Sequence, residues 1–121
     1  MALTKIRPMF TTWDLDETIN FYVEVLGFSM GCRMDEWQWA SLNRDGIELM
    51  ISGPNDRLDE SEPAFTGSIY LDCDDIDAEW SRLKDIARVC YPLETFPYGM
   101  REFAIYDNNG YLIKFGCPNS N

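Results

Sequence analysis

Apolar and polar residues alternate with a period of two over much of this chain, and this pattern predicts β-strands. The clearest case is residues 98–115, where Phe103, Ile105, Ile113 and Phe115 alternate with small, polar or charged neighbours. The Asp-Asn-Asn-Gly sequence between the two runs accepts the positive φ that a tight turn requires. The stretch therefore predicts a β-hairpin with one strongly apolar face and one mixed face that carries charges.

The same alternation predicts further strands at residues 5–11, 28–33, 37–44, 47–52, 67–73 and 89–93. In the third of these, Trp37 and Trp39 are expected on one face of the strand. Apolar residues spaced three or four apart predict amphipathic helices instead, at residues 15–26 and 76–86. Asp14 is the expected N-cap of the first helix, and Asp75 with its acidic neighbour is expected to cap the second.

The order strand, helix and three strands occurs twice, and Asp14-Leu15-Asp16 returns as Asp75-Ile76-Asp77. We therefore expect one domain of two tandem βαβββ modules, α+β in class. The modules cover about residues 4–53 and 67–118, and an acidic surface linker joins them at about residues 54–66. One helix covers only one face of each sheet, so the other face is expected to meet a cavity, the second module or a second chain.

Composition narrows the range of possible functions. The chain has 121 residues, a mass of 14.0 kDa and a net charge of −11. This charge argues against nucleic acid and anionic membrane surfaces as partners, and it suits a cationic ligand or simple solubility. The chain has no histidine, so catalysis through a histidine base and metal binding through imidazole are both excluded.

The four cysteines show no C-x-x-C spacing, so neither a zinc site nor a disulfide framework is predicted. The N-terminal residues lack the apolar region of a signal peptide, and no run is long enough to span a membrane. We therefore expect a cytoplasmic protein.

Two sets of residues resemble the vicinal oxygen chelate superfamily, which includes glyoxalases, bleomycin resistance proteins and extradiol dioxygenases. The first half carries Asp14-Leu15-Asp16, Phe21-Tyr22 and Leu26-Gly27-Phe28, and the second half carries Asp72, Asp74-Asp75-Ile76-Asp77-Ala78, Arg101-Glu102-Phe103, Asp107 and Gly110. The resemblance covers the whole chain. It implies that the two modules form a curved mixed sheet with a cavity.

The resemblance also implies where metal-dependent members hold their metal. The matching positions are Arg7, Ser68 and Lys114, none of which is a typical ligand of zinc, iron or manganese. We therefore predict no metal and no other cofactor. Alternation places Arg7 and Lys114 on the same faces as Glu48 and Glu102, so we expect these charges to pair where the metal would lie. The alternative is that they are solvated at a sheet edge.

The segment from Tyr98 to Phe103 resembles the Trp-Gly-x-x-Glu-Phe run of the bleomycin resistance proteins, with tyrosine in place of tryptophan. The implied function is metal-independent binding of a cationic or aromatic small molecule in a cavity at a homodimer interface, with no catalytic residue. Aromatic rings would stack on the ligand and acids would neutralise its charge. The candidate ligand-binding residues are Trp37, Trp39, Tyr98, Glu48, Glu102, Tyr70, Asp72 and Tyr106.

Two other functions stay open. The chain could be a metal-free isomerase or lyase that uses Glu102, Glu48 or Lys114 as acid or base, which would require a strongly perturbed pKa. It could also be a structural or protein-binding dimer, with Trp37 and Trp39 at the interface instead of in a cavity.

Overall fold

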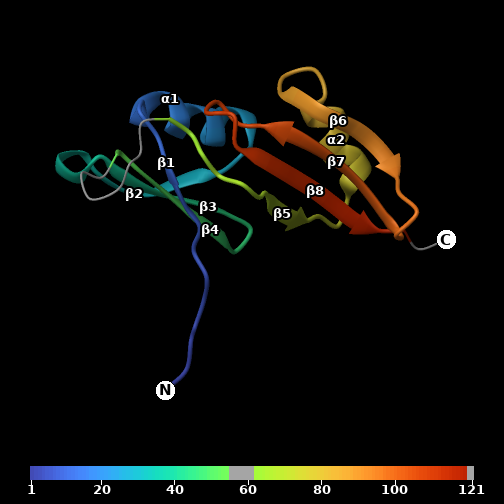
Figure 1. Cartoon of the computed structure of the whole chain (residues 1–121), viewed down its shortest axis with the longest axis horizontal. Helices are drawn as coiled ribbons and strands as arrows, with labels where there is room; N and C mark the ends of the chain where they lie inside the picture. Colours follow the sequence, from blue (N-terminus) through green and yellow to red (C-terminus); the bar gives the residue numbers. More distant parts are fainter. Residues whose placement is uncertain (55–61, 120–121) are drawn as a thin grey trace. The chain divides into compact units, whose positions relative to one another are not determined.

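The computed structural model describes residues 1–54 and 62–119 of the chain. The chain divides into two compact units, residues 1–63 and 64–121, each with a four-stranded mixed sheet (Figure 1). In each unit a helix packs on one face of the sheet. The predicted α+β class with two tandem modules is therefore confirmed. Most of the predicted linker lies at residues 55–61, outside the described residues.

Unit 1 contains four strands and two consecutive helical segments after the first strand. Its elements are β1 (Met9–Thr11), α1 (Leu15–Asn20), the π-helix η1 (Phe21–Val25), β2 (Ser29–Met34), the 3-10 helix η2 (Asp35–Trp37), β3 (Trp39–Arg44) and β4 (Ile47–Ser52). The strand order is β1-β4-β3-β2, with β1 parallel to β4 and the other pairs antiparallel.

Unit 2 repeats this plan. Its elements are β5 (Ile69–Asp72), α2 (Ile76–Leu83), β6 (Arg88–Thr95), β7 (Met100–Tyr106) and β8 (Leu112–Pro118). The strand order is β5-β8-β7-β6, and β5 is parallel to β8. Each sheet thus places the first strand of its module beside the last strand, as the sequence repeat suggests.

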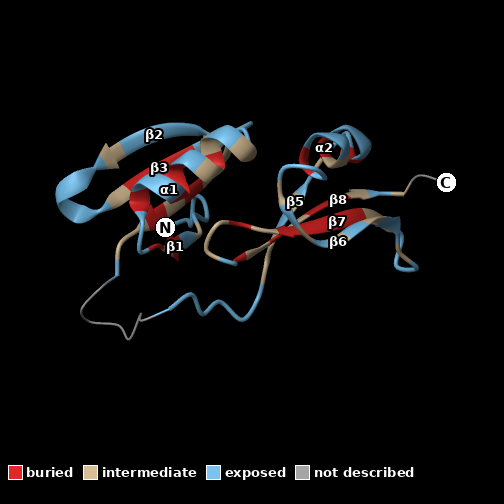
Figure 2. Cartoon of the chain, turned by 90° about the horizontal axis from the view of Figure 1, so that it is seen from above, coloured by how far each residue is buried: buried red, intermediate tan, exposed pale blue. Residues whose placement is uncertain are grey.

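Both helices begin where the sequence predicts. The Asp14 side chain accepts a hydrogen bond from the Glu17 backbone N–H at 3.0 Å, and Asp75 accepts one from Ala78 at 3.2 Å. Each carboxylate satisfies a free N–H in the first turn. Most of the large buried apolar residues come from the helix and the sheet strands of each unit (Figure 2). They include Phe10, Leu15, Ile19, Leu42, Leu49 and Ile51 in unit 1, and Ile76, Leu83, Phe103, Ile105, Ile113 and Phe115 in unit 2.

The hairpin turn before β8 forms as predicted. The Gly110 N–H donates to the Asp107 carbonyl at 3.0 Å, and Gly110 has a φ of 90°, which glycine adopts without steric cost. The buried Asp107 carboxylate also accepts from the backbone N–H groups of Asn109 and Tyr111. The turn therefore fixes the register of β7 against β8.

The prediction that the first strand begins at residue 5 was wrong, because β1 begins only at Met9. Pro8 lacks the N–H that a strand residue would donate, although its carbonyl accepts from Met50 at 2.8 Å. The predicted strand at residues 37–44 also begins late. Trp37 ends the 3-10 helix, and Gln38 follows with a φ of 49°. Trp37 is therefore not on the same strand face as Trp39.

Helix ends differ from prediction as well. The first helix changes from α to π geometry after Asn20, and the Leu26 N–H bonds back to the Phe21 carbonyl at 3.2 Å. The second helix ends at Leu83, whose carbonyl accepts from both Ile86 and Ala87. This tight turn returns the chain to β6.

Candidate functional site

The candidate site is the sheet face of unit 2 that lies opposite α2, which we call the helix-free face. Its residues include Tyr70 and Asp72 on β5, Glu102 on β7, and Lys114 on β8. The adjacent β7 residues point the other way, because Phe103 packs on Trp80 of α2 with ring centroids 5.1 Å apart. The predicted facing of Glu102 and Lys114 is therefore confirmed.

Glu102 is the centre of this face. The residue is only 2% exposed, and its two carboxylate oxygens accept hydrogen bonds from three tyrosine hydroxyls. Tyr98 donates to Oε1 at 2.6 Å, Tyr70 donates to the same oxygen at 3.3 Å, and Tyr91 on β6 donates to Oε2. We call Tyr70, Tyr91 and Tyr98 the tyrosine cluster. A buried carboxylate without such partners would be strongly destabilising.

The tyrosine cluster keeps Glu102 ionised. Burial raises the pKa of Glu102, but the three hydrogen bonds and the positive charge of Lys114 lower it, and the net shift is downward. Burial and the Glu102 charge raise the pKa of Tyr70 to about 12. The hydrogen bond to Glu102 and burial raise the pKa of Tyr98 to about 12. At neutral pH the site therefore holds one carboxylate surrounded by neutral phenols.

Tyr70 reaches Glu102 because Gly116 has no side chain. A Cβ added at Gly116 would overlap the Tyr70 hydroxyl and lie 2.6 Å from Tyr70 Cζ. The phenol of Tyr70 thus occupies the space over the Gly116 backbone. A larger residue at this position in β8 would displace the tyrosine.

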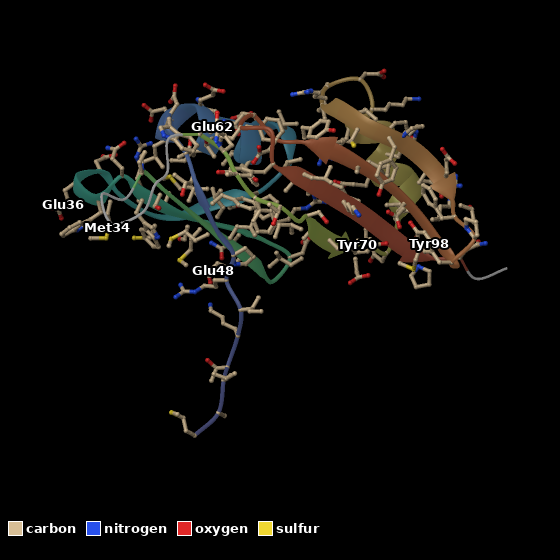
Figure 3. The ribbon with its side chains drawn as sticks, viewed as in Figure 1. Met34, Glu36, Glu48, Glu62, Tyr70 and Tyr98 are labelled. Atoms are coloured by element: carbon tan, nitrogen blue, oxygen red, sulfur yellow. The ribbon has the colours of Figure 1, made fainter. Side chains whose placement is uncertain are left out.

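Tyr98 presents a fixed aromatic surface. Its ring stacks on Phe96 with centroids 5.4 Å apart and an interplanar angle of 9°, while its hydroxyl is held by Glu102. Phe96 in turn contacts Tyr91 edge-on at 5.6 Å. Tyr98 nevertheless remains 65% exposed, and Tyr70 is 39% exposed (Figure 3). Two tyrosine rings are therefore both positioned and accessible.

The remaining candidates of unit 2 do not contact Glu102 directly. Asp72 is exposed on the same face as Tyr70. Tyr106 lies further along β7, where the Arg88 guanidinium sits 4.5 Å from its ring centroid. Within the described part of the chain, the ion pairs do not include one between Lys114 and Glu102. The expected pairing of these two was wrong, and the carboxylate oxygens accept from tyrosine hydroxyls instead.

Unit 1 holds the other candidates. Glu48 forms ion pairs with Lys5 at 2.5 Å and with Arg7 at 3.4 Å, beside the N-terminal segment (Figure 3). The expected pairing of Arg7 with Glu48 is therefore observed. These contacts, mainly the one with Lys5, lower the pKa of Glu48. Trp39 is half-buried in β3, whereas Trp37 is 68% exposed on η2.

A depression of about 310 Å³ lies elsewhere in unit 2, at the N-terminus of α2. Its lining includes Asp74, Asp77 and Arg101, and an ion pair of 2.7 Å joins Arg101 to Asp77. The lining does not include Glu102 or the tyrosine cluster. The ion pair neutralises part of the acidic surface there.

The family model of the Glyoxalase/Bleomycin resistance protein/Dioxygenase superfamily matches residues 7–115. The chain belongs to this superfamily. No curated protein matches the sequence. Within residues 1–54 and 62–119, no helix is long and apolar enough to cross a membrane.

Several solved structures share the fold. TnmS3, an antibiotic binding protein from Streptomyces sp. CB03234, is 24% identical with a TM-score of 0.76, and the match covers 98% of both chains. A protein of unknown function from Agrobacterium tumefaciens str. C58 is 21% identical with a TM-score of 0.78, over 97% of this chain and 95% of the other. A lactoylglutathione lyase from Agrobacterium tumefaciens is 17% identical with a TM-score of 0.70, over 94% and 92%.

The metal positions that the resemblance implies are Arg7, Ser68 and Lys114. Arg7 and Lys114 are cations, and Ser68 precedes β5 without an imidazole or carboxylate. Among the described residues, no group of three or more His, Cys, Asp or Glu side chains could hold a metal ion. The residues at the superfamily's metal positions thus do not fit a divalent ion.

The sequence did not indicate several of the residues at the site. Tyr91 was missed because β6 has register shifts on both sides of it: Val89 lies opposite Ile105, but Tyr91 lies opposite Ala104. The bulge turns Tyr91 to the other face, so simple alternation fails. Lys5 could have been found, since alternation places it on the same side as Arg7. No local pattern marked Phe96 or Gly116.

Proposed function

We propose that this chain is a metal-independent small-molecule-binding protein of the bleomycin resistance type. It binds a cationic or aromatic ligand on the helix-free face of unit 2 without altering it. The observation that carries this proposal is the state of Tyr98, whose ring is held by Glu102 and Phe96 and yet is largely exposed. A positioned ring loses little conformational entropy when a flat ligand stacks on it.

The pKa values of the candidate carboxylates support binding over acid–base catalysis. Both candidate carboxylates, Glu102 and Glu48, have lowered pKa values and accept hydrogen bonds from several donors. A general base works best with a pKa near the operating pH, so these carboxylates are poorly suited to that role. The fold itself is compatible with either function, because the antibiotic binding protein TnmS3 and a lactoylglutathione lyase both share it.

We further propose that the protein is a cytoplasmic homodimer and that the ligand cavity lies at its interface. In each unit a helix covers one sheet face only, and the helix-free face of unit 2 carries exposed aromatic rings. Symmetric pairing would bury such faces. Light scattering after size exclusion should give twice the 14.0 kDa chain mass, and a monomeric mass would refute the dimer.

Calorimetric titration of the full chain with bleomycin, in buffer containing EDTA, tests the binding proposal. We expect binding at micromolar concentration or below. Tyr98→Ala should weaken it about fivefold or more, since an aromatic contact contributes about 1 kcal/mol beyond its buried area. Ile86→Ala removes an exposed apolar side chain from the turn after α2 and serves as the control, with an expected change below about twofold.

Two results would refute the proposal in this form. One is the absence of binding by the unaltered chain at millimolar bleomycin. The other is equal binding by the unaltered chain and by Tyr98→Ala, which would show that the ligand does not bind on the helix-free face. Chemical conversion of bleomycin, followed by mass spectrometry during the same titration, would contradict simple sequestration.

A further inference from the structure

We infer that the helix-free face of unit 2 selects methylated or charge-delocalised organic cations, and that it holds them against the tyrosine rings instead of in an ion pair with Glu102. This inference rests on the proposed function and names the class of ligand for the same site. Its basis is that the negative charge of the site and its exposed surface belong to different residues. The negative charge is buried, and the surfaces around it are aromatic.

Glu102 is poorly placed for a direct ion pair. The residue is 2% exposed, and Tyr91, Tyr98 and Tyr70 already donate to its oxygens. To reach these oxygens, a primary ammonium group would have to enter a buried position that already holds three hydroxyls, and lose its own water. Primary ammonium ions are strongly hydrated point charges, so that exchange is unfavourable.

The carboxylate charge still acts on the surface through the tyrosines. The hydroxyls of Tyr98 and Tyr70 donate inward to Glu102, while both residues remain exposed and Phe96 stacks on the Tyr98 ring, so an approaching ligand meets aromatic ring surface. An organic cation over such a ring is attracted by the ring quadrupole and by the charge behind it. A methylated cation has no N–H to satisfy and loses little hydration, so it suits these ring faces.

Four other charged residues face the same side of the sheet, and one of them, Arg88, lies over the ring of Tyr106. Asp72 on β5 and Glu94 on β6 are exposed, and Glu94 lies opposite Glu102 in the β6–β7 register. Both add attraction for a cation. Lys114, beside Tyr70 in the β5–β8 register, opposes it. Lys114 should therefore limit cation affinity, and its removal should strengthen binding.

Three probes of similar size distinguish the possibilities by NMR titration of the full chain. Choline carries a methylated cation, 3,3-dimethyl-1-butanol is its neutral isostere, and ethanolamine carries a primary ammonium. We expect choline to bind about tenfold more tightly than either of the others. Binding should shift the ring resonances of Tyr98, and Ile86→Ala should bind choline as the unaltered chain does.

Two variants test the electrostatic argument with opposite signs. Glu102→Gln should weaken choline binding about tenfold, which is the effect expected of one charge several ångströms away, and leave the neutral isostere unchanged. Lys114→Met, at the partly exposed position, should strengthen choline binding about threefold. If Glu102→Gln does not fold, Lys114→Met still tests the electrostatic argument, because choline binding should become stronger and not weaker.

The outcomes separate this inference from the proposed function. Tighter binding of ethanolamine than choline would indicate a direct ion pair and overturn the inference, as would equal binding of choline and its neutral isostere. If bleomycin binds at this face without any such preference, the inference fails and the proposed function stands. If neither bleomycin nor any of the three probes binds, both fail.

Discussion

Gly116 is the position where the smallest change should disturb the candidate site. Alanine there would place a Cβ 2.6 Å from Tyr70 Cζ, so the phenol must move away from Glu102. The hydrogen bond lost is made to a charged group and contributes about 1.5 kcal/mol, at the low end of the range because it is 3.3 Å long. Replacing a strand glycine by alanine by itself stabilises the folded state by about 0.5 kcal/mol. We therefore expect a net destabilisation of about 1 kcal/mol.

A double-mutant cycle isolates this contact. In a Tyr70→Ala background the obstruction is gone, so Gly116→Ala should stabilise the protein by about 0.5 kcal/mol. The effect of Gly116→Ala on the free energy of unfolding should thus change sign between the two backgrounds, with a coupling of about 1.5 kcal/mol. Urea denaturation followed by circular dichroism measures both values. Equal effects of Gly116→Ala in the two backgrounds would refute the placement of Tyr70 over Gly116.

Three other predictions concern the tyrosine cluster and the helix caps. Absorbance at 295 nm should show Tyr70 and Tyr98 ionising near pH 12, and Glu102→Gln should move this titration to lower pH; an unchanged titration would contradict the network. Because the folded pKa of Glu102 is lowered, its stabilisation is present above its unfolded pKa of about 4.3 and is lost as pH falls through the folded value. The stability of Glu102→Gln should therefore fall less between pH 7 and pH 3, as urea midpoints would reveal. Asp75→Ala should cost about 1 kcal/mol by removing the N-cap of α2, whereas a neutral effect would show that solvent replaces the cap.

The hydrophobic periodicity of the chain was sufficient to predict most of the fold. Alternation located β4 at its observed bounds, and it placed Glu48, Glu102 and Lys114 on the faces opposite the helices. It failed where the backbone leaves regular geometry. Pro8 interrupts the hydrogen bonding before β1, and Gln38 turns the chain just after Trp37. Such departures depend on single residues that an alternating pattern does not register.

The site itself was only partly readable from the sequence. The bleomycin resistance-type run pointed to Tyr98 and Glu102, and the structure joins them by a hydrogen bond of 2.6 Å. Tyr70 was among the candidates, but its contact with Glu102 was not foreseen. The expected partner of Glu102 was Lys114, which influences its pKa without an ion pair.

The sequence by itself determined the two-module plan, the face on which each charge lies, and the mismatch of Arg7, Ser68 and Lys114 with a metal site. The first two follow from local periodicity, and the third follows from the resemblance to the superfamily together with residue chemistry. Only the tertiary structure decided which groups touch Glu102. Its hydrogen-bond donors come from β5, β6 and the segment before β7, and they meet because of strand order, the bulge in β6 and the missing side chain at Gly116. Contacts between distant segments depend on such packing, which local sequence does not encode.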